Sequence, residues 1–240
     1  MHKFTRLFDV IVTVWILGCV ATLLAYCLWS LDRGLDLTDE SYYLAAAINP
    51  DAVILWATAM HWFTSDLWQL SGSLAGFRGM GLAILTVSSV VLALGAVRAF
   101  LMSGIDVVAR GFPILLIVAC SLAGALLYHA FMPFTPSYNL LAVSGVYMAL
   151  GLIYLTANIP RSLRFYCLQF LSGTALGIAF LAKFSSGVLA WSIVCGIVVV
   201  LGGSSCQRIQ GMGLITGSMA TTRTTRNNDH QRKQIIWGVR

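Results

Sequence analysis

The sequence contains few charged residues. They make up 10% of the chain, against about 25% in a typical soluble domain, while 58% of the residues are hydrophobic. The mean hydropathy of +0.83 excludes a soluble globular protein and indicates a polytopic membrane protein. The net charge of +6 does not indicate nucleic-acid binding, because the basic residues are spread over short loops and the C-terminal segment instead of one face.

Several catalytic and metal-binding patterns are also absent from the sequence. It has no Walker phosphate-binding loop, no dinucleotide fingerprint, and neither an HExxH nor a GxSxG motif, so a soluble nucleotide donor has no visible site. The six cysteines form no CxxC pair and most lie in apolar runs, which is typical of small packing residues. His61 and His129 are far apart in the sequence, so no metal ligand is predicted.

Long apolar runs predict about six membrane spans. The first run, 10–31, is close to the ~20 residues that a helix needs to cross a bilayer. It lacks a small-residue cleavage site, so we interpret it as an uncleaved signal anchor. The other predicted spans are 79–101, 112–131, 138–157, 165–182 and 187–203. Their Gly, Ala and Ser residues permit close helix packing in lipid, and the sequence therefore predicts an all-α, polytopic membrane helical bundle.

The longest segment outside these spans, 32–79, is the predicted first external loop. Residues 41–48 are expected to be helical, and Asn49-Pro50-Asp51 to end that helix. The aromatic residues of 53–70 favour the membrane–water interface, which predicts interfacial helices in this loop. A short second span is the alternative, and the polar residues within this segment disfavour it.

The basic residues predict the orientation of the chain. With six spans and a cytoplasmic N-terminus, all but three of the 15 basic residues lie on the cytoplasmic side, and the three outside are Arg33, Arg78 and Lys183. This distribution follows the positive-inside rule. It predicts a transmembrane domain over 1–203 in a bacterial inner (plasma) membrane, with the loop 32–79 in the periplasm. The polar segment 204–240 is the predicted disordered cytoplasmic tail.

Acidic residues are concentrated directly after the first span. Five of the nine acidic residues lie within 32–51, and Glu40 is the only glutamate of the chain. In this position the motif Thr38-Asp39-Glu40-Ser41-Tyr42-Tyr43 resembles the first external loop of the GT-C glycosyltransferases. These are polytopic enzymes that take a sugar from a polyprenyl-phosphate carrier, such as protein mannosyltransferases and aminoarabinose transferases. A solvated loop made acidic for solubility or orientation is the alternative.

The resemblance implies that a carboxylate of this motif takes the proton of the acceptor hydroxyl. Asp39 matches the catalytic aspartate of the family and is the candidate base, with Glu40 second. Adjacent residues point to different sides of a helix or strand, so one carboxylate is expected to act and the other to support it. Tyr42 and Tyr43 of the same motif are the candidate substrate-binding tyrosines.

Cationic and polar residues that lie on the same predicted face are candidates for binding the carrier phosphate. Lys183 ends a Gly-rich span that looks like the corresponding GT-C segment, and Arg78 lies where GT-C members often carry an arginine. Tyr138 and Asn139 are candidates to line an outward cavity. Simpler interpretations remain open: Lys183 as a snorkelling anchor, Arg78 as an interface anchor, and the segment before Tyr138 as a plain turn.

The resemblance implies sugar transfer from a polyprenyl-phosphate carrier to a hydroxyl of a glycan, lipid or protein acceptor, with inversion at the anomeric carbon. The lipid-linked sugar is the donor, and a divalent metal requirement stays open. GT-C members usually have more than six spans, so the resemblance implies an N-terminal portion, and a truncated, inactive form is one alternative. The other is a non-enzymatic small transporter or assembly subunit. Ion-coupled transport is disfavoured because the predicted spans lack Asp and Glu apart from Asp9 at the edge of the first.

Overall fold

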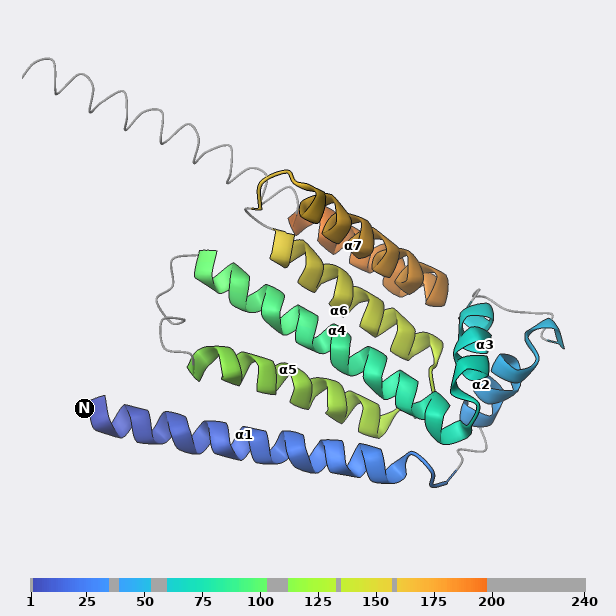
Figure 1. The fold of residues 1–240 in the computed structure, drawn as a ribbon, viewed down its shortest axis with the longest axis horizontal. Coiled ribbons are helices and arrows are strands. Elements are labelled where there is room, and N and C mark those ends of the chain that lie inside the picture. The colour runs from blue at the N-terminus through green and yellow to red at the C-terminus, as the bar shows by residue number, and fades with distance from the viewer. Residues whose placement is uncertain are drawn as a thin grey trace, which may run out of the picture. The chain divides into compact units, whose positions relative to one another are not determined.

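The described part of the molecule is built from helices (Figure 1). The computed structural model describes residues 2–34, 39–52, 60–102, 112–132, 135–156 and 159–197. No β-strand occurs among these residues, which confirms the predicted all-α class. In chain order the elements are α1 (His2–Ser30), α2 (Asp39–Ile48), the 3₁₀ helix η1 (Pro50–Ala52), α3 (Met60–Ser71), α4 (Leu74–Met102), α5 (Phe112–Phe131), α6 (Tyr138–Thr156) and α7 (Leu163–Ala182).

Among the described residues, five helices are long and apolar enough to cross a membrane, which confirms the polytopic helical architecture. A helix suits this role because it satisfies its backbone hydrogen bonds within the segment, and the bilayer core offers no water to do so. The five stretches are Leu7–Ser30, Leu74–Leu101, Ile114–Phe131, Tyr138–Thr156 and Leu163–Ala182. The sixth predicted span, 187–203, begins inside the shorter apolar helix Phe184–Ile197. Its last residues, 198–203, and the predicted tail lie outside the described residues.

The chain divides into two compact units, Met1–Ser192 and Ile193–Arg240. Of the second unit the structure describes only residues 193–197, which are helical. All contacts discussed below lie within the first unit.

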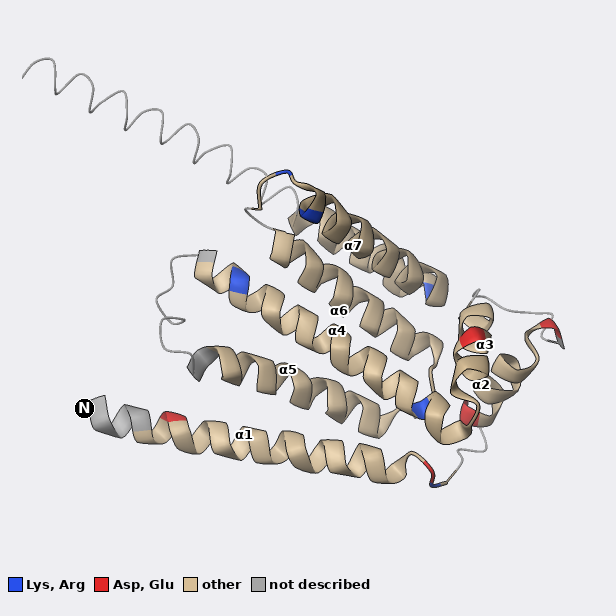
Figure 2. Cartoon of the chain, in the orientation of Figure 1, with Lys and Arg blue, Asp and Glu red and all other residues tan. Residues whose placement is uncertain are grey.

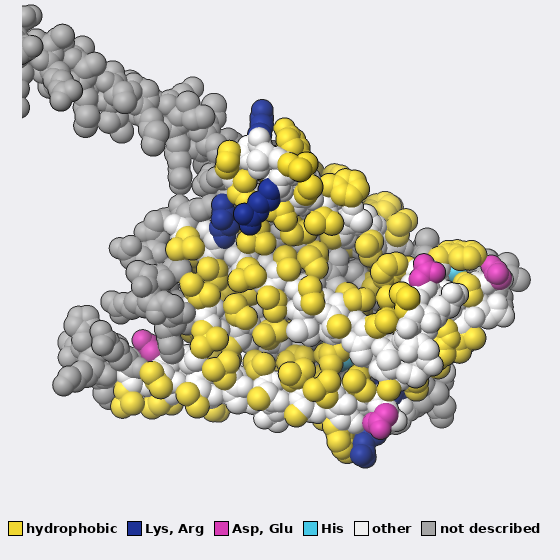
Figure 3. All heavy atoms as spheres, viewed as in Figure 1, with side chains coloured by type: hydrophobic (Ala, Val, Ile, Leu, Met, Phe, Trp, Pro, Cys, Tyr) yellow, Lys and Arg dark blue, Asp and Glu magenta, His cyan; other side chains and the backbone are white. Residues whose placement is uncertain are grey.

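Within the first unit, α1 packs against α5, α5 against α4, α4 against α6 and α6 against α7 (Figure 1). In the apolar stretch of α6, 56% of the residues are buried inside the protein, against only 6% in the apolar stretch of α1. The helix α6 is therefore central, and α1 exposes most of its apolar surface. On the face seen in Figure 3, hydrophobic side chains cover the middle of the helices, and charged side chains lie toward their ends. This distribution is the one expected of helices surrounded by lipid.

Small residues allow α6 to approach both of its neighbours closely. A Cβ atom added to Gly151 of α6 would lie 2.5 Å from the carbonyl oxygen of Val91 in α4. On the other side, a Cβ atom at Gly145 would lie 2.6 Å from the carbonyl oxygen of Ala175 in α7. Since only glycine leaves space for the neighbouring backbone at these two crossings, the packing depends on glycine there.

Side-chain hydrogen bonds also connect neighbouring helices. The Ser89 hydroxyl in α4 donates to the Ser121 carbonyl in α5 at 2.8 Å, and Ser172 in α7 donates to Ala149 in α6 at 3.1 Å. Bonds of this kind between membrane helices contribute about 1 kcal/mol each. They therefore support the register set by the small residues.

The helices α2 and α3 lie together at one end of the first unit, which we call the loop end. It also contains the C-terminal ends of α1 and α7 and the first turns of α4 and α6, as the contacts of Arg78 with Ser30 and of Lys183 with Asn139 show. α2 packs on α3, and α3 on α4. Most of the described acidic residues lie at the loop end (Figure 2).

The described elements of the loop end agree with the predicted helix and its break, and α3 covers the later part of the predicted segment 53–70, whose residues 53–59 lie outside the described residues. α2 ends at Ile48 and η1 begins at Pro50, as the sequence Asn49-Pro50-Asp51 predicts. α2 begins at Asp39, two residues before the predicted start, so both carboxylates of the motif lie in its first turn. Carboxylates are favourable at this position, because the N-terminus of a helix carries a partial positive charge.

Candidate functional site

Arg78 is a buried cation at the loop end. α4 begins at Leu74, before the predicted start of this span at residue 79, so the helix carries Arg78 into the protein. Its side chain is 1% exposed, and that of its partner Glu40 is 2% exposed. The guanidinium binds the carboxylate with two bonds: Nε donates to Oε1 at 2.8 Å, and Nη2 donates to Oε2 at 2.7 Å.

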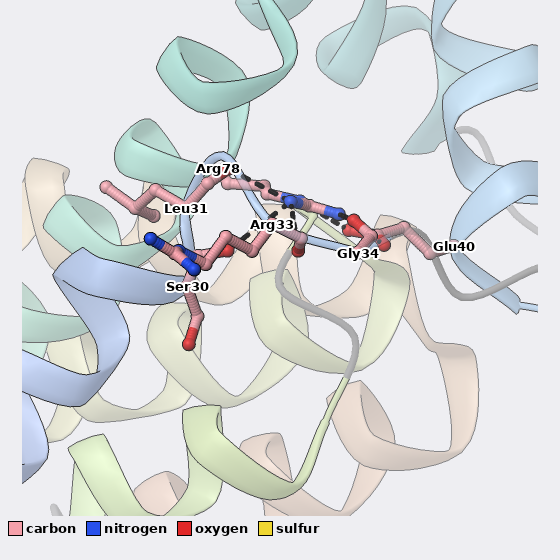
Figure 4. Close-up of polar contacts among 6 residues, drawn as sticks. All are labelled: Ser30, Leu31, Arg33, Gly34, Glu40 and Arg78. Carbon is pink, nitrogen blue, oxygen red and sulfur yellow. Dashed lines mark hydrogen bonds and ion pairs between the residues drawn. The ribbon is translucent and has the colours of Figure 1, made fainter.

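The remaining donors of Arg78 bind the end of α1 (Figure 4). Nη1 donates to the carbonyl oxygens of Leu31 at 2.9 Å and Arg33 at 3.1 Å, and Nη2 donates to the carbonyl of Gly34. These three carbonyl groups belong to the turn that directly follows the last residue of α1, Ser30, and a carbonyl oxygen that is removed from water needs a hydrogen-bond donor. A cation at this position therefore satisfies them, and Arg78 links the end of α1, the start of α2 and the start of α4.

Gly34 belongs to this arrangement although the sequence analysis did not select it. Its φ of 62° lies in the left-handed region, which glycine adopts without the steric cost of a Cβ atom. A glycine a few residues after an apolar run is a known signal for the end of a helix. That signal was present in the sequence, but it does not reveal which side chain would bind the carbonyl.

Asp39 lies beside Glu40 in the first turn of α2 but has a different environment. Its side chain is exposed, whereas Glu40 is buried. This difference agrees with the expectation that adjacent residues point to different sides. The exposed carboxylate is available to a molecule outside the protein, and the buried carboxylate is already bound by Arg78.

Lys183 forms a second cluster at the loop end, with residues of α6 and α2. Lys183 follows the last residue of α7 in an extended conformation and is half-buried. Its Nζ donates to Oδ1 of Asn139 at 2.9 Å and lies 5.5 Å from the centre of the Tyr138 ring. Both of these partners are uncharged, and among the described residues no carboxylate forms an ion pair with Lys183.

Tyr43 connects the Lys183 cluster with the first turn of α2. Its ring packs edge-on against Tyr138 with 5.7 Å between the ring centres. Burial raises the pKa of the Tyr43 hydroxyl, and its hydrogen bond with Tyr138 and the negative charge of Asp39 raise that pKa further. Asp39 lies one helical turn before Tyr43 in α2, and residues at this spacing are neighbours on one side of a helix.

An apolar core lies directly beneath these polar groups. It contains Tyr43 and Met60 of the loop-end helices, Leu140 of α6 and Ala182, the last residue of α7. The neighbour of Ala182 is Lys183, so the ammonium group lies at the edge of a low-dielectric region. An ionic interaction there is stronger than one in bulk water.

The structure thus divides the predicted site residues into two groups. Arg78 and Glu40 bind each other, whereas Lys183, Asn139, Tyr138 and Tyr43 lie together, with Asp39 nearby. Tyr42 is exposed, and its ring contacts that of Tyr43 at 6.0 Å between the ring centres. Among the residues that the structure describes, no group of three His, Cys, Asp or Glu side chains could hold a metal ion.

Comparison of the chain with protein-family models, curated proteins and solved structures finds no match. What defines the chain is therefore its architecture, a polytopic membrane protein built from apolar helices, and the geometry of the loop end.

Proposed function

We propose that the protein is a membrane glycosyltransferase that moves a sugar from a polyprenyl-phosphate carrier to an acceptor hydroxyl at the loop end. The observation that carries the proposal is Lys183, a half-buried ammonium group without a carboxylate partner among the described residues. An ammonium group is a common ligand of phosphate in proteins. Its position at the end of a membrane span suits a phosphate attached to a lipid tail.

The first turn of α2 supplies the base in this proposal. The exposed Asp39 carboxylate takes the proton of the acceptor hydroxyl, and the acceptor oxygen attacks the anomeric carbon. The bond between that carbon and the phosphate oxygen breaks, and its electron pair leaves with the polyprenyl phosphate. Lys183 stabilises the negative charge that develops on the leaving phosphate. The protonated Asp39 then releases its proton to water.

The remaining residues of the Lys183 cluster have supporting roles. Asn139 orients the ammonium group through its side-chain oxygen, and the Tyr138 ring provides a π-face beside it. Tyr42 is exposed next to Asp39 and is placed to contact the sugar or the acceptor. The donor reaches the site laterally from the membrane, which is consistent with the absence of a nucleotide-binding motif from the sequence.

The distribution of charge supports an outward-facing loop end. Only Arg33, Arg78 and Lys183 of the 15 basic residues in the sequence belong to the loop end in the predicted topology. The described Arg98, Arg161 and Arg164 lie in the last turns of α4 and at the start of α7, away from it. By the positive-inside rule the loop end then faces the periplasm of a bacterial inner membrane, with the N-terminus in the cytoplasm. The acceptor in this orientation is a glycan, lipid or protein hydroxyl.

Binding of the leaving group tests the proposal. The full chain is reconstituted in proteoliposomes, and binding of a labelled polyprenyl phosphate is measured for the wild type and for Lys183→Gln. We expect Lys183→Gln to weaken binding about tenfold or more, since a bond to a charged group is worth about 1.5–3 kcal/mol. Arg33→Gln is the control, because Arg33 is an exposed cation of the same end. Equal affinity in all three proteins would contradict the proposal.

A further inference from the structure

The ion pair between Arg78 and Glu40 joins three segments that are separate in the sequence. Arg78 belongs to α4, Glu40 to α2, and the bound carbonyl groups to the end of α1. We infer that this pair positions the first turn of α2, and through it Asp39, and that neither residue contacts the substrate. The inference rests on the proposed function, in which Asp39 is the base.

The donors of Arg78 leave none for a ligand. A guanidinium group has five N–H donors in a fixed planar arrangement. In the structure Nε binds Glu40, Nη2 binds Glu40 and Gly34, and Nη1 binds Leu31 and Arg33. All three nitrogen atoms are therefore used by the protein, and the charge is matched by a carboxylate that is 2% exposed. A phosphate group would have to displace these partners before it could bind Arg78.

The helix α2 is held at two points that lie one turn apart. Glu40 is held by Arg78, and Tyr43 is held by Tyr138 and by the apolar core with Met60. Two contacts at this spacing fix both the position of the helix and its rotation about its own axis. Asp39 lies in the same turn as Glu40, so its direction is set by these contacts. Without the ion pair, the first turn would be held only from its C-terminal side.

The geometry requires arginine and not simply a positive charge. A lysine ammonium group has the same charge, but it cannot bind both carboxylate oxygens in a planar fork while it also reaches three carbonyl groups. Arg78→Lys therefore keeps the charge and removes the geometry. Glu40→Gln keeps the shape of the partner and removes its charge. The two variants disturb the same pair from opposite sides.

The first measurement does not depend on activity. Nitroxide labels are placed at Ala45, which is exposed on α2, and at Ser185, which is exposed just after Lys183. The distance distribution between the labels is then measured by electron paramagnetic resonance in proteoliposomes. We expect it to broaden in Arg78→Lys and in Glu40→Gln and to stay unchanged in Arg33→Lys, which is the same substitution at an exposed arginine. An unchanged distribution in both pair variants would overturn the inference.

The second measurement separates positioning from binding. For transfer from a labelled polyprenyl-phosphate sugar, misplacement of Asp39 is expected to lower kcat by up to about 100-fold, which is the effect of a displacement of about 1 Å. The KM for the donor should stay within about twofold, because Lys183 and its partners are intact. A raised KM with unchanged kcat would mean that Arg78 binds the phosphate, and would overturn the inference. Absence of transfer in the wild type would instead contradict the proposed function and leave the distance measurement valid.

Discussion

The crossing of α4 and α6 allows a prediction with a calculable magnitude, for the substitution Gly151→Ala. The added Cβ atom would lie 2.5 Å from the Val91 carbonyl oxygen, 2.6 Å from the Val91 carbonyl carbon and 2.7 Å from the Leu92 nitrogen. Ordinary contacts between such atoms are about 3.5–4.0 Å, so the two helices have to separate by about 1 Å. All three atoms belong to the backbone, and a side-chain rotation cannot relieve the contact.

Two opposing terms determine the expected change in stability. Overpacking of this kind costs about 1–3 kcal/mol, and the upper end applies here because the backbone itself must move. Replacing glycine by alanine within a helix contributes about 1 kcal/mol in the opposite direction. We therefore expect Gly151→Ala to lower the free energy of unfolding by about 2 kcal/mol.

The matched control is Gly124→Ala in α5. No atom from outside the surrounding turns of its own helix lies within 4 Å of a Cβ atom built at Gly124. Only the helix-propensity term therefore applies, and the stability should stay unchanged or rise by up to about 1 kcal/mol. The assay is reversible unfolding in mixed micelles, with the free energy of unfolding measured for both variants and the wild type. If Gly151→Ala is as stable as Gly124→Ala, the close approach of α4 and α6 is refuted.

Two further predictions concern the pKa of Tyr43 and the orientation of the loop end. The pKa of Tyr43 is raised in the folded protein, so the unfolded chain loses the Tyr43 proton first, at pH about 10. The free energy of unfolding should therefore fall as the pH rises above that value. Thermal unfolding of Tyr43→Phe should show a smaller fall over the same pH range, because the variant has no hydroxyl to titrate. If Tyr43→Phe loses stability as steeply as the wild type, this assignment fails. For the orientation, Asp51→Cys should react with a membrane-impermeant maleimide in intact cells, and Arg164→Cys should react only after permeabilisation. Both positions are exposed, but position 51 is predicted to face the periplasm and position 164 the cytoplasm. The reverse pattern would exclude a periplasmic loop end.

Hydropathy predicted the five described spans well because their apolar runs are long and bounded by polar residues. The run of the α4 span is the exception, since its helix starts at Leu74 and not at residue 79. Gly76 and Arg78 interrupt the apolar pattern there and make the first turn look like a loop. The arginine belongs to the helix because its charge is matched by Glu40, which a hydropathy profile does not include.

The pairings of the loop end were beyond what the sequence alone can predict. Glu40 and Arg78 are 38 positions apart, and Asn139 and Lys183 are 44 positions apart. No spacing rule connects residues on different helices, so the sequence identified these four residues but not their partners. Periodicity likewise indicated that Asp39 and Glu40 would point to different sides, but not which of them would be buried. That choice depends on the position of Arg78.

Sugar transfer by Asp39→Asn shows whether Asp39 is the base of the reaction. Asp66→Asn is the matched control, because Asp66 is an exposed carboxylate of the same end, in α3. Transfer from a labelled polyprenyl-phosphate sugar is measured in proteoliposomes that contain equal amounts of each protein. We expect Asp39→Asn to lose at least about 100-fold in rate, since a general base contributes about 10²–10⁴-fold, and Asp66→Asn to match the wild type. Transfer by Asp39→Asn at the rate of the wild type would contradict the assignment of Asp39 as the base.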